Sequence, residues 1–353
     1  MSITVKGYPW SSGIGTNVED CQTARDVIEK AKLNFHVEKC QVVAKMPFMI
    51  NGINTIQDGD GFAYDGNIFR EMEGAYATYR TDLNIPLGLV KQKYEVVQNN
   101  DAFNFFDDAI GEDKARFVTA GYLGVGQKIF ITAKLPEEIV VKGDPVETYL
   151  VFSNSHDGSS SINIMFTPVR VFCTNCLNAG LKSSDSYIKI KHTRSAKDRL
   201  QEGSRILKIA CEQANTTQLF YESLATIKMK DQDVMEYICK LVLTEQEMQD
   251  VRAYGGVNPF EKIIASNWYV KSKAEISTRK CNILASMWGY YLFGPGQDKI
   301  VGSAWGAYNA VTGYYSNIAS MEGEARMERL VWGSSNIAMS KALNEVYDIA
   351  KAV

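Results

Sequence analysis

Successive apolar runs separated by turns constrain the fold of this chain more than any other feature of its sequence. The segment from Arg116 to Leu135 contains two such runs around a turn at Gly124 to Gly126, and further runs follow at Glu147 to Asn154 and Ile162 to Phe172. From about residue 76 to 182 the predicted order is strands, a helix, three antiparallel strands and a helix. Strands that follow one another without regular helical crossovers pair antiparallel, so the sequence predicts an antiparallel β-meander core with flanking helices.

The chain changes character beyond Lys197, where apolar residues recur with the 3.6-residue period of helices. Thr244 with Glu247 has the spacing of a capping box, and Asn258 before Pro259 marks the start of a helix that we expect to run to about Val270. Further helices are predicted over residues 275–293, 300–319 and 336–352. The predicted class is α+β, with an antiparallel-sheet domain at residues 1–196 and a mainly helical domain at residues 197–353.

Composition excludes several broad classes of protein. With 353 residues, of which 45% are hydrophobic and 22% charged, the chain can bury a core without disulfides. Its seven cysteines lie mostly in apolar runs, which indicates reduced thiols in a cytosolic protein. The N-terminus lacks the pattern of a signal peptide, and no run of about 18 apolar residues is present. We therefore expect a cytoplasmic protein that does not enter a membrane.

The most basic part of the chain lies between Lys182 and Lys208. It holds eight basic and three acidic residues, although the whole chain has a net charge of −3. In the strand-like sequence YIKIKHTR, the two-residue period places Lys189, Lys191 and Thr193 on one face, opposite two isoleucines and a histidine. Such a row of ammonium groups could follow a phosphate backbone. A solvated strand face followed by a charged helical turn is the alternative.

The candidate phosphate contacts extend this basic row on both sides. They are Arg170, Lys182, Lys189, Lys191, Arg194, Lys197 and Arg199, with Tyr187 as a candidate for stacking on bases. Arg170 lies within an apolar strand, where a guanidinium needs a carboxylate or a phosphate as its partner. A structural ion pair is therefore the alternative for Arg170.

Motifs for catalysis or metal binding are incomplete. Cys173 and Cys176 form a single C-x-x-C pair, whereas a zinc site needs further ligands, so no metal is expected. The sequence His156-Asp157-Gly158-Ser159 contains the residue types of a hydrolytic triad, but adjacent residues in one loop do not converge as a triad does. We expect this loop to cap its own turn or to meet phosphate through Ser159 to Ser161. The interpretation is a protein without enzymatic activity or cofactor.

Four segments give the chain a resemblance to a known family. They are KYEVVQNNDAFNF at residues 93–105, HDGSSSINIMFTPVRVFCTNCLNAG at residues 156–180, IKHTR at residues 190–194 and WGAYNAVTGYYSN at residues 305–317. In this order they resemble the phage/plasmid-like proteins of a domain-of-unknown-function family found in bacteriophages and mobile elements. The resemblance implies a phage or plasmid origin and a role in the cytoplasm of the bacterial host, and it carries over no catalytic residue.

The predicted element order is also similar to the core of single-strand annealing recombinases such as RecT and Red-beta, which form rings or filaments and hold DNA by its backbone. This similarity is architectural. The leading hypothesis is a non-enzymatic phage protein that binds single-stranded DNA as a homo-oligomer and anneals or recombines it. The alternative is a phage interaction, structural or counter-defence protein whose partner is another protein, bound through the apolar segment around Trp305, Tyr308, Tyr314 and Tyr315.

Overall fold

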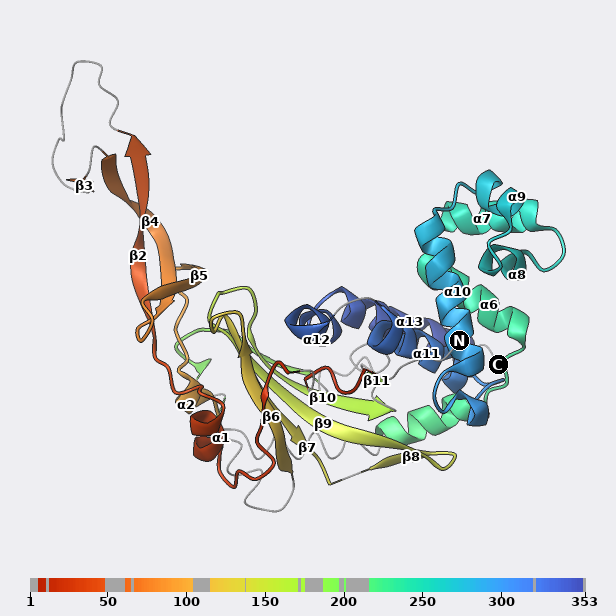
Figure 1. Ribbon diagram of the computed structural model, residues 1–353, viewed down its shortest axis with the longest axis horizontal. Helices are drawn as coiled ribbons and strands as arrows, with labels where there is room; N and C mark the ends of the chain where they lie inside the picture. The colour runs from red at the N-terminus through yellow and green to blue at the C-terminus, as the bar shows by residue number, and fades with distance from the viewer. Residues whose placement is uncertain are drawn as a thin grey trace.

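A central β-sheet joins an elongated β-arm to a helical lobe (Figure 1). The computed structural model describes residues 6–10, 13–47, 61–64, 67–103, 115–136, 138–170, 173–174, 187–196, 200, 216–319 and 322–351. Antiparallel strands dominate the first half and helices the second, so the predicted α+β class is confirmed. None of the described helices is both long and apolar enough to span a membrane.

The central sheet is antiparallel throughout. Among the described residues its strands run in the order β1-β6-β7-β9-β10-β11, with β12 beside β10 and β8 beside β9. They are β1 (Thr16–Asn17), β6 (Arg116–Leu123), β7 (Lys128–Lys134), β8 (Ile139–Val141), β9 (Asp144–Ser155), β10 (Ile162–Arg170), β11 (Cys173–Thr174) and β12 (Tyr187–Ile190). The predicted meander is therefore present as β6, β7, β9 and β10, and the first turn has Gly124 and Gly126 at positive φ, where glycine is favoured.

Both faces of this sheet are covered, and the two-residue period of the strands assigns each side chain to one face. Phe130 and Met165 pack with Met327 of helix α12 in one apolar cluster. Ile131 and Phe152 point the other way into the main core, which also contains buried residues of α1, α2 and most helices of the second half. Strand β10 is buried along its entire length. The main core thus includes side chains from both sides of residue 196, and the boundary there stays a prediction.

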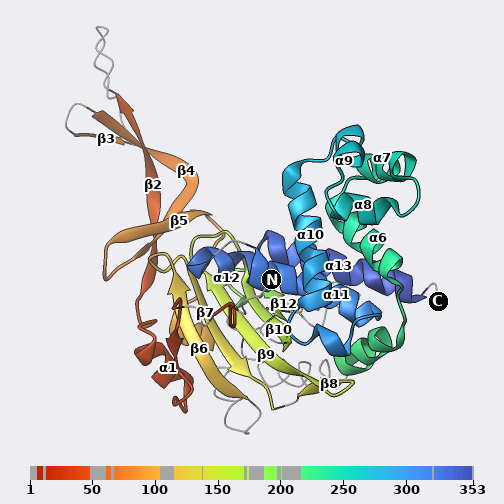
Figure 2. The same ribbon diagram turned by 45° about the vertical axis from the view of Figure 1, so that its right-hand side comes forward.

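The helices of the first half are short, and those of the second half form the lobe. They are α1 (Ala24–Lys30), α2 (Asn99–Phe103), a helical stretch over residues 216–226, α6 (Asp231–Val242), α7 (Glu245–Gly255), α8 (Pro259–Ile264), α9 (Trp268–Lys273), α10 (Thr278–Phe293), the 3₁₀ turn η1 (Gln297–Lys299), α11 (Ala304–Gly313), the π-helical turn η2 (Tyr314–Ile318), α12 (Gly323–Val331) and α13 (Ser334–Lys351). Helix α12 packs on the sheet through Met327, and α13 packs against α6, α11 and α12. Helices α7, α8 and α9 project away from the sheet (Figure 2).

One predicted capping motif is confirmed, and two of the predicted helices differ in detail. The capping box of Thr244 and Glu247 is present at α7. The helix that begins at Pro259 ends at Ile264 because Ser266 adopts a left-handed conformation with φ of 57°, and Asn267 then caps the new helix α9. The helix expected over residues 300–319 begins at Ala304 and widens into the π turn η2. Helix α12 was not predicted.

The β-arm is a second, twisted sheet that extends away from the body in both views (Figures 1 and 2). It consists of β2 (Val37–Pro47), β3 (Gly61–Tyr64), β4 (Asn67–Arg80) and β5 (Ile85–Lys91), all paired antiparallel. At its base the Arg80 guanidinium lies 3.9 Å from the centre of the Phe35 ring, pairs with Asp82 and donates to the carbonyl of Val125. This cation–π and hydrogen-bonded contact fixes the arm to the β6–β7 turn.

Candidate functional site

Strand β12 presents its lysines as the sequence pattern predicts. Its register with β10 places Lys189 opposite Asn163 and Ile190 opposite Ile162. Ile190 is buried in the main core, whereas Lys189, Lys191 and Thr193 are exposed. The predicted alternation of charged and apolar faces is therefore confirmed over the described part of this segment.

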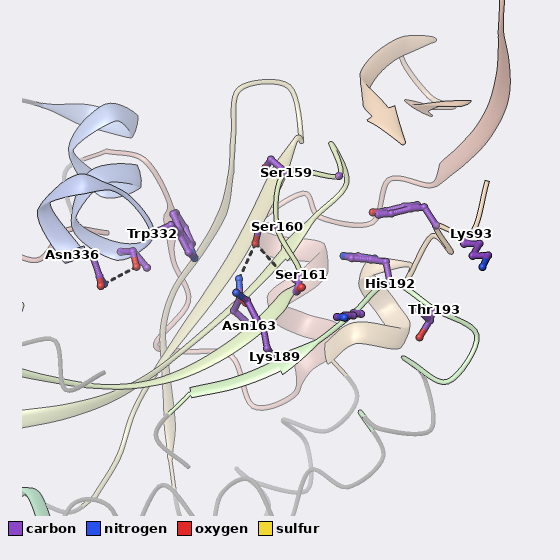
Figure 3. A pocket seen from close by; sticks show the side chains of 14 residues that line it. Lys93, Ser159, Ser160, Ser161, Asn163, Lys189, His192, Thr193, Trp332 and Asn336 are labelled. Atoms are coloured by element: carbon purple, nitrogen blue, oxygen red, sulfur yellow. Dashed lines mark hydrogen bonds between the residues drawn. The ribbon is translucent and has the colours of Figure 1, made fainter. Parts of the chain in front are cut away.

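The exposed face of β12 forms part of an open cleft of about 650 Å³. Lys189 lies beside Asn163 and the serines Ser159 to Ser161, while Lys93, just after β5, lies on one side and Trp332, between α12 and α13, on the other (Figure 3). Lys191 also lines the cleft. None of the described residues that line the cleft is acidic. Within the described part of the chain, neither Lys93 nor Lys191 forms an ion pair with a carboxylate.

The serine loop between β9 and β10 is held by its own carboxylate. One oxygen of Asp157 accepts hydrogen bonds from the Ser159 amide at 2.9 Å and the Ser159 hydroxyl at 2.7 Å, and also from the Ser155 hydroxyl. Burial alone would raise the pKa of Asp157, but these hydrogen bonds outweigh it and hold the pKa below its usual range. The loop caps its own turn as predicted, and the carboxylate is engaged within the turn while Ser159 to Ser161 face the cleft.

Two buried histidines belong to this region: His192 lines the cleft, and His156 directly precedes the serine loop. Nε2 of His156 lies 2.8 Å from Oδ1 of Asn99, and burial lowers the pKa of His156 to about 3. His192 stacks on Tyr94 with ring centres 4.5 Å apart, and burial lowers its pKa to about 4. Both imidazoles are neutral at physiological pH, so they contribute packing and no positive charge.

Trp332 and Lys93 were not found by sequence reasoning. The Trp332 indole N–H donates to the hydroxyl of Ser153 at 3.1 Å, and the Asn336 amide donates to the carbonyl of Val331 at 2.9 Å. These bonds fix a half-buried aromatic ring at the edge of the cleft, where it can offer a stacking surface. The sequence contains only a weak indication for Lys93, which lies at the end of the strand predicted to finish near Tyr94.

Arg170 lies away from this cleft. Its side chain is 1% exposed, pairs with Asp144 and donates to the carbonyl of Gly296 at 2.8 Å. The alternative of a structural ion pair describes its position, and a guanidinium buried in this way is not placed to meet a phosphate. Arg194 is 96% exposed and lies 3.8 Å from Glu95, close to the cleft but outside its lining.

The remaining predicted residues are only partly described. Lys182, Lys197 and Arg199 lie outside the described residues, as does Cys176. The backbone of Tyr187 pairs with Met165 in β12, and its side chain is not among those described. In the described ranges no cluster of three or more histidine, cysteine or acidic side chains is arranged to hold a metal ion.

The family model of the domain of unknown function DUF932 matches residues 86–343. The chain belongs to this family. The searches of curated proteins and of solved structures found no match. The matched DUF932 region contains every residue that lines the cleft, from Lys93 to Asn336, whereas strands β2, β3 and β4 of the arm precede it.

Proposed function

We propose that this protein binds single-stranded DNA by its sugar–phosphate backbone in the cleft of β12. The supporting observation is the convergence of Lys93, Lys189 and Lys191 on a cleft whose described lining holds no carboxylate. Lysine ammonium groups spaced along a groove neutralise successive phosphates without reading sequence. The hydroxyls of Ser159 to Ser161 add hydrogen-bond donors of the kind that orient a phosphate.

A single strand fits this arrangement better than a duplex does. The half-buried ring of Trp332 faces the same cleft as the lysines, and base stacking on an aromatic ring needs an unpaired base. In a duplex the bases are stacked on one another, so only the phosphates could be used. The proposed contacts are therefore Lys93, Lys189 and Lys191 for phosphates and Trp332 for a base, with Arg194 at the exit of β12.

More specifically, we propose that the protein is a homo-oligomer that anneals DNA strands in a phage recombination or replication system, without hydrolysing nucleotides. It rests on the phage-family resemblance of the four sequence segments and on an element order similar to that of the RecT-type core. Annealing needs two backbones held with their bases exposed, which backbone neutralisation can achieve without a general base. Residues Lys182, Lys197 and Arg199 belong to this proposal as further phosphate contacts.

The competing proposal, a protein-binding role, has a less favourable surface. Trp305 and Tyr308, on which it was based, are both 0% exposed in the main core. Tyr314 and Tyr315 are half-buried. Helix α11 therefore contributes to core packing, and a protein partner that binds in this region would have to use Tyr314 and Tyr315.

Fluorescence anisotropy with a labelled 30-nucleotide single strand at low salt tests strand binding. We expect binding by the unaltered chain, and its loss in Lys189→Glu/Lys191→Glu. The matched control is Lys273→Glu/Lys299→Glu, which reverses two exposed lysines outside the cleft. Absence of binding by the unaltered chain, or equal loss in both double variants, would refute the proposal. Strand annealing is tested by mixing two labelled complementary strands with the protein and measuring fluorescence energy transfer between the labels. Light scattering tests whether the protein is a homo-oligomer.

A further inference from the structure

A second cavity, of about 700 Å³, is also bordered by residues around the α12–α13 turn. Its walls come from α10, the π turn η2, the end of α12 and the start of α13. Its volume is within the range of small-molecule sites. Its described lining shares no residue with the β12 cleft.

Two arginines from different helices give this cavity its charge. Arg279 of α10 and Arg329 of α12 both line it, and both are exposed. Among the described residues neither guanidinium makes a hydrogen bond or an ion pair, and the described lining contains no acidic side chain. A guanidinium presents paired donors that match the oxygens of a phosphate, so two of them without carboxylates favour a phosphorylated ligand.

Part of the wall is aromatic. Tyr314 and Tyr315 are half-buried, with ring centres 5.1 Å apart in an edge-to-face arrangement. They lie on the π-helical turn η2, a distortion of helical geometry that occurs frequently at functional sites. Burial raises the pKa of Tyr314, so its phenol stays protonated and neutral at physiological pH. Ser286 and Asn282 of α10 add polar groups to the lining.

We propose that this cavity binds a nucleoside phosphate, with the phosphate at Arg279 and Arg329 and the base against Tyr314. Phosphate alone would leave the aromatic wall unused, and an uncharged aromatic ligand would leave two guanidinium groups without a counter-charge. The ligand is either a free nucleotide or one nucleotide of a bound strand, since both have this chemistry. The inference is independent of strand binding in the β12 cleft.

Isothermal titration calorimetry at low salt with inorganic phosphate, deoxyadenosine monophosphate and the oligonucleotide dA10 tests the proposal. All titrations use the Lys189→Glu/Lys191→Glu background, so that binding in the β12 cleft does not contribute. We expect Arg279→Gln/Arg329→Gln to weaken binding of the nucleotide probe at least tenfold, and Tyr314→Leu to weaken it severalfold. Lys273→Gln/Lys299→Gln, which removes two exposed charges outside the cavity, should leave it unchanged.

The pattern of binding identifies the source of the nucleotide. Arginine-dependent binding of the monophosphate supports a free nucleotide, and arginine-dependent binding of dA10 alone supports a nucleotide within a strand. Binding of inorganic phosphate as tightly as either nucleotide probe overturns the nucleoside assignment. Failure of every probe to bind, or binding unchanged in Arg279→Gln/Arg329→Gln, overturns the site. Thermal melting of each variant by circular dichroism shows that the fold is retained.

Discussion

The salt dependence of the proposed DNA binding gives the sharpest test of the cleft, because it would count the phosphates that the lysines neutralise. Lys93, Lys189 and Lys191 line the cleft, and each ammonium that meets a phosphate releases condensed counterions. For a single strand the logarithm of the association constant falls by about 0.7 per contact for each tenfold rise in salt. Three contacts predict a slope of about −2, so raising salt from 50 to 200 mM should weaken binding about twentyfold.

Replacing Lys189 and Lys191 by glutamine leaves one of these three contacts. The slope should then fall to about −0.7, and the same change in salt should weaken binding less than about threefold. Anisotropy titrations at four salt concentrations measure both slopes. The control variant Lys273→Gln/Lys299→Gln should keep the slope of the unaltered chain. A slope that does not change when Lys189 and Lys191 are replaced would show that the phosphates lie elsewhere, whatever the affinity.

Three further predictions concern the groups that support the cleft and the sheet. Arg170→Met leaves the buried carboxylate of Asp144 without its ion-pair partner, so urea unfolding should show a free energy of unfolding lower by about 3–5 kcal/mol. Much of this loss should be restored in Arg170→Met/Asp144→Leu. A loss below about 1 kcal/mol would contradict the importance of the pair. Because burial lowers the pKa of His156 to about 3 and of His192 to about 4, the unfolded chain binds more protons than the folded one as pH falls below about 6.5. Each histidine should therefore lower the free energy of unfolding by about 2 kcal/mol between pH 7 and pH 5, and His156→Gln/His192→Gln should flatten this dependence; an equal slope in both proteins would refute the assignment. A side chain added in Gly88→Ala would clash with the backbone of Asp157 and displace the serine loop, so we expect about 1–3 kcal/mol of destabilisation and severalfold weaker DNA binding. Gly289→Ala, which has open space around it inside helix α10, should instead stabilise the protein by up to about 1 kcal/mol and leave DNA binding unchanged.

Local periodicity accounts for the parts of the site that sequence reasoning placed. The exposure of Lys189 and Lys191 follows from a two-residue strand period and needs no knowledge of the partner strand. The turn at Asp157 is equally local, since its carboxylate bonds residues at most two positions away. The meander itself followed from successive apolar runs. These features depend on residues close in sequence, which is the range over which a single sequence is informative.

Contacts between residues distant in sequence account for the parts of the site that the sequence did not predict. The partner of Arg170 lies 26 residues earlier, at Asp144, and pattern alone could not choose between a carboxylate and a phosphate. Trp332 reaches the cleft through a hydrogen bond to Ser153, which is 179 residues away. Nothing in the sequence around Trp332 distinguishes an aromatic residue at a cleft from one in the core. The left-handed Ser266 that separates α8 from α9 was also hidden, because serine usually avoids that conformation.

The α12–α13 turn relates the two cavities and indicates how the cleft is assembled. Trp332 and Asn336 face the β12 cleft, while Arg329 and Ser335, within a few residues, face the second cavity. The turn is held to the sheet by the bond from Trp332 to Ser153, and α12 is held to the N-terminal segment by Arg326, which donates to the carbonyls of Gly7 and Ser316. The wall of the cleft therefore forms only when the helical half packs on the completed sheet. A fragment that ends near residue 196 would keep Lys189 and Lys191 but lose Trp332, so strand binding by base stacking requires both halves of the chain.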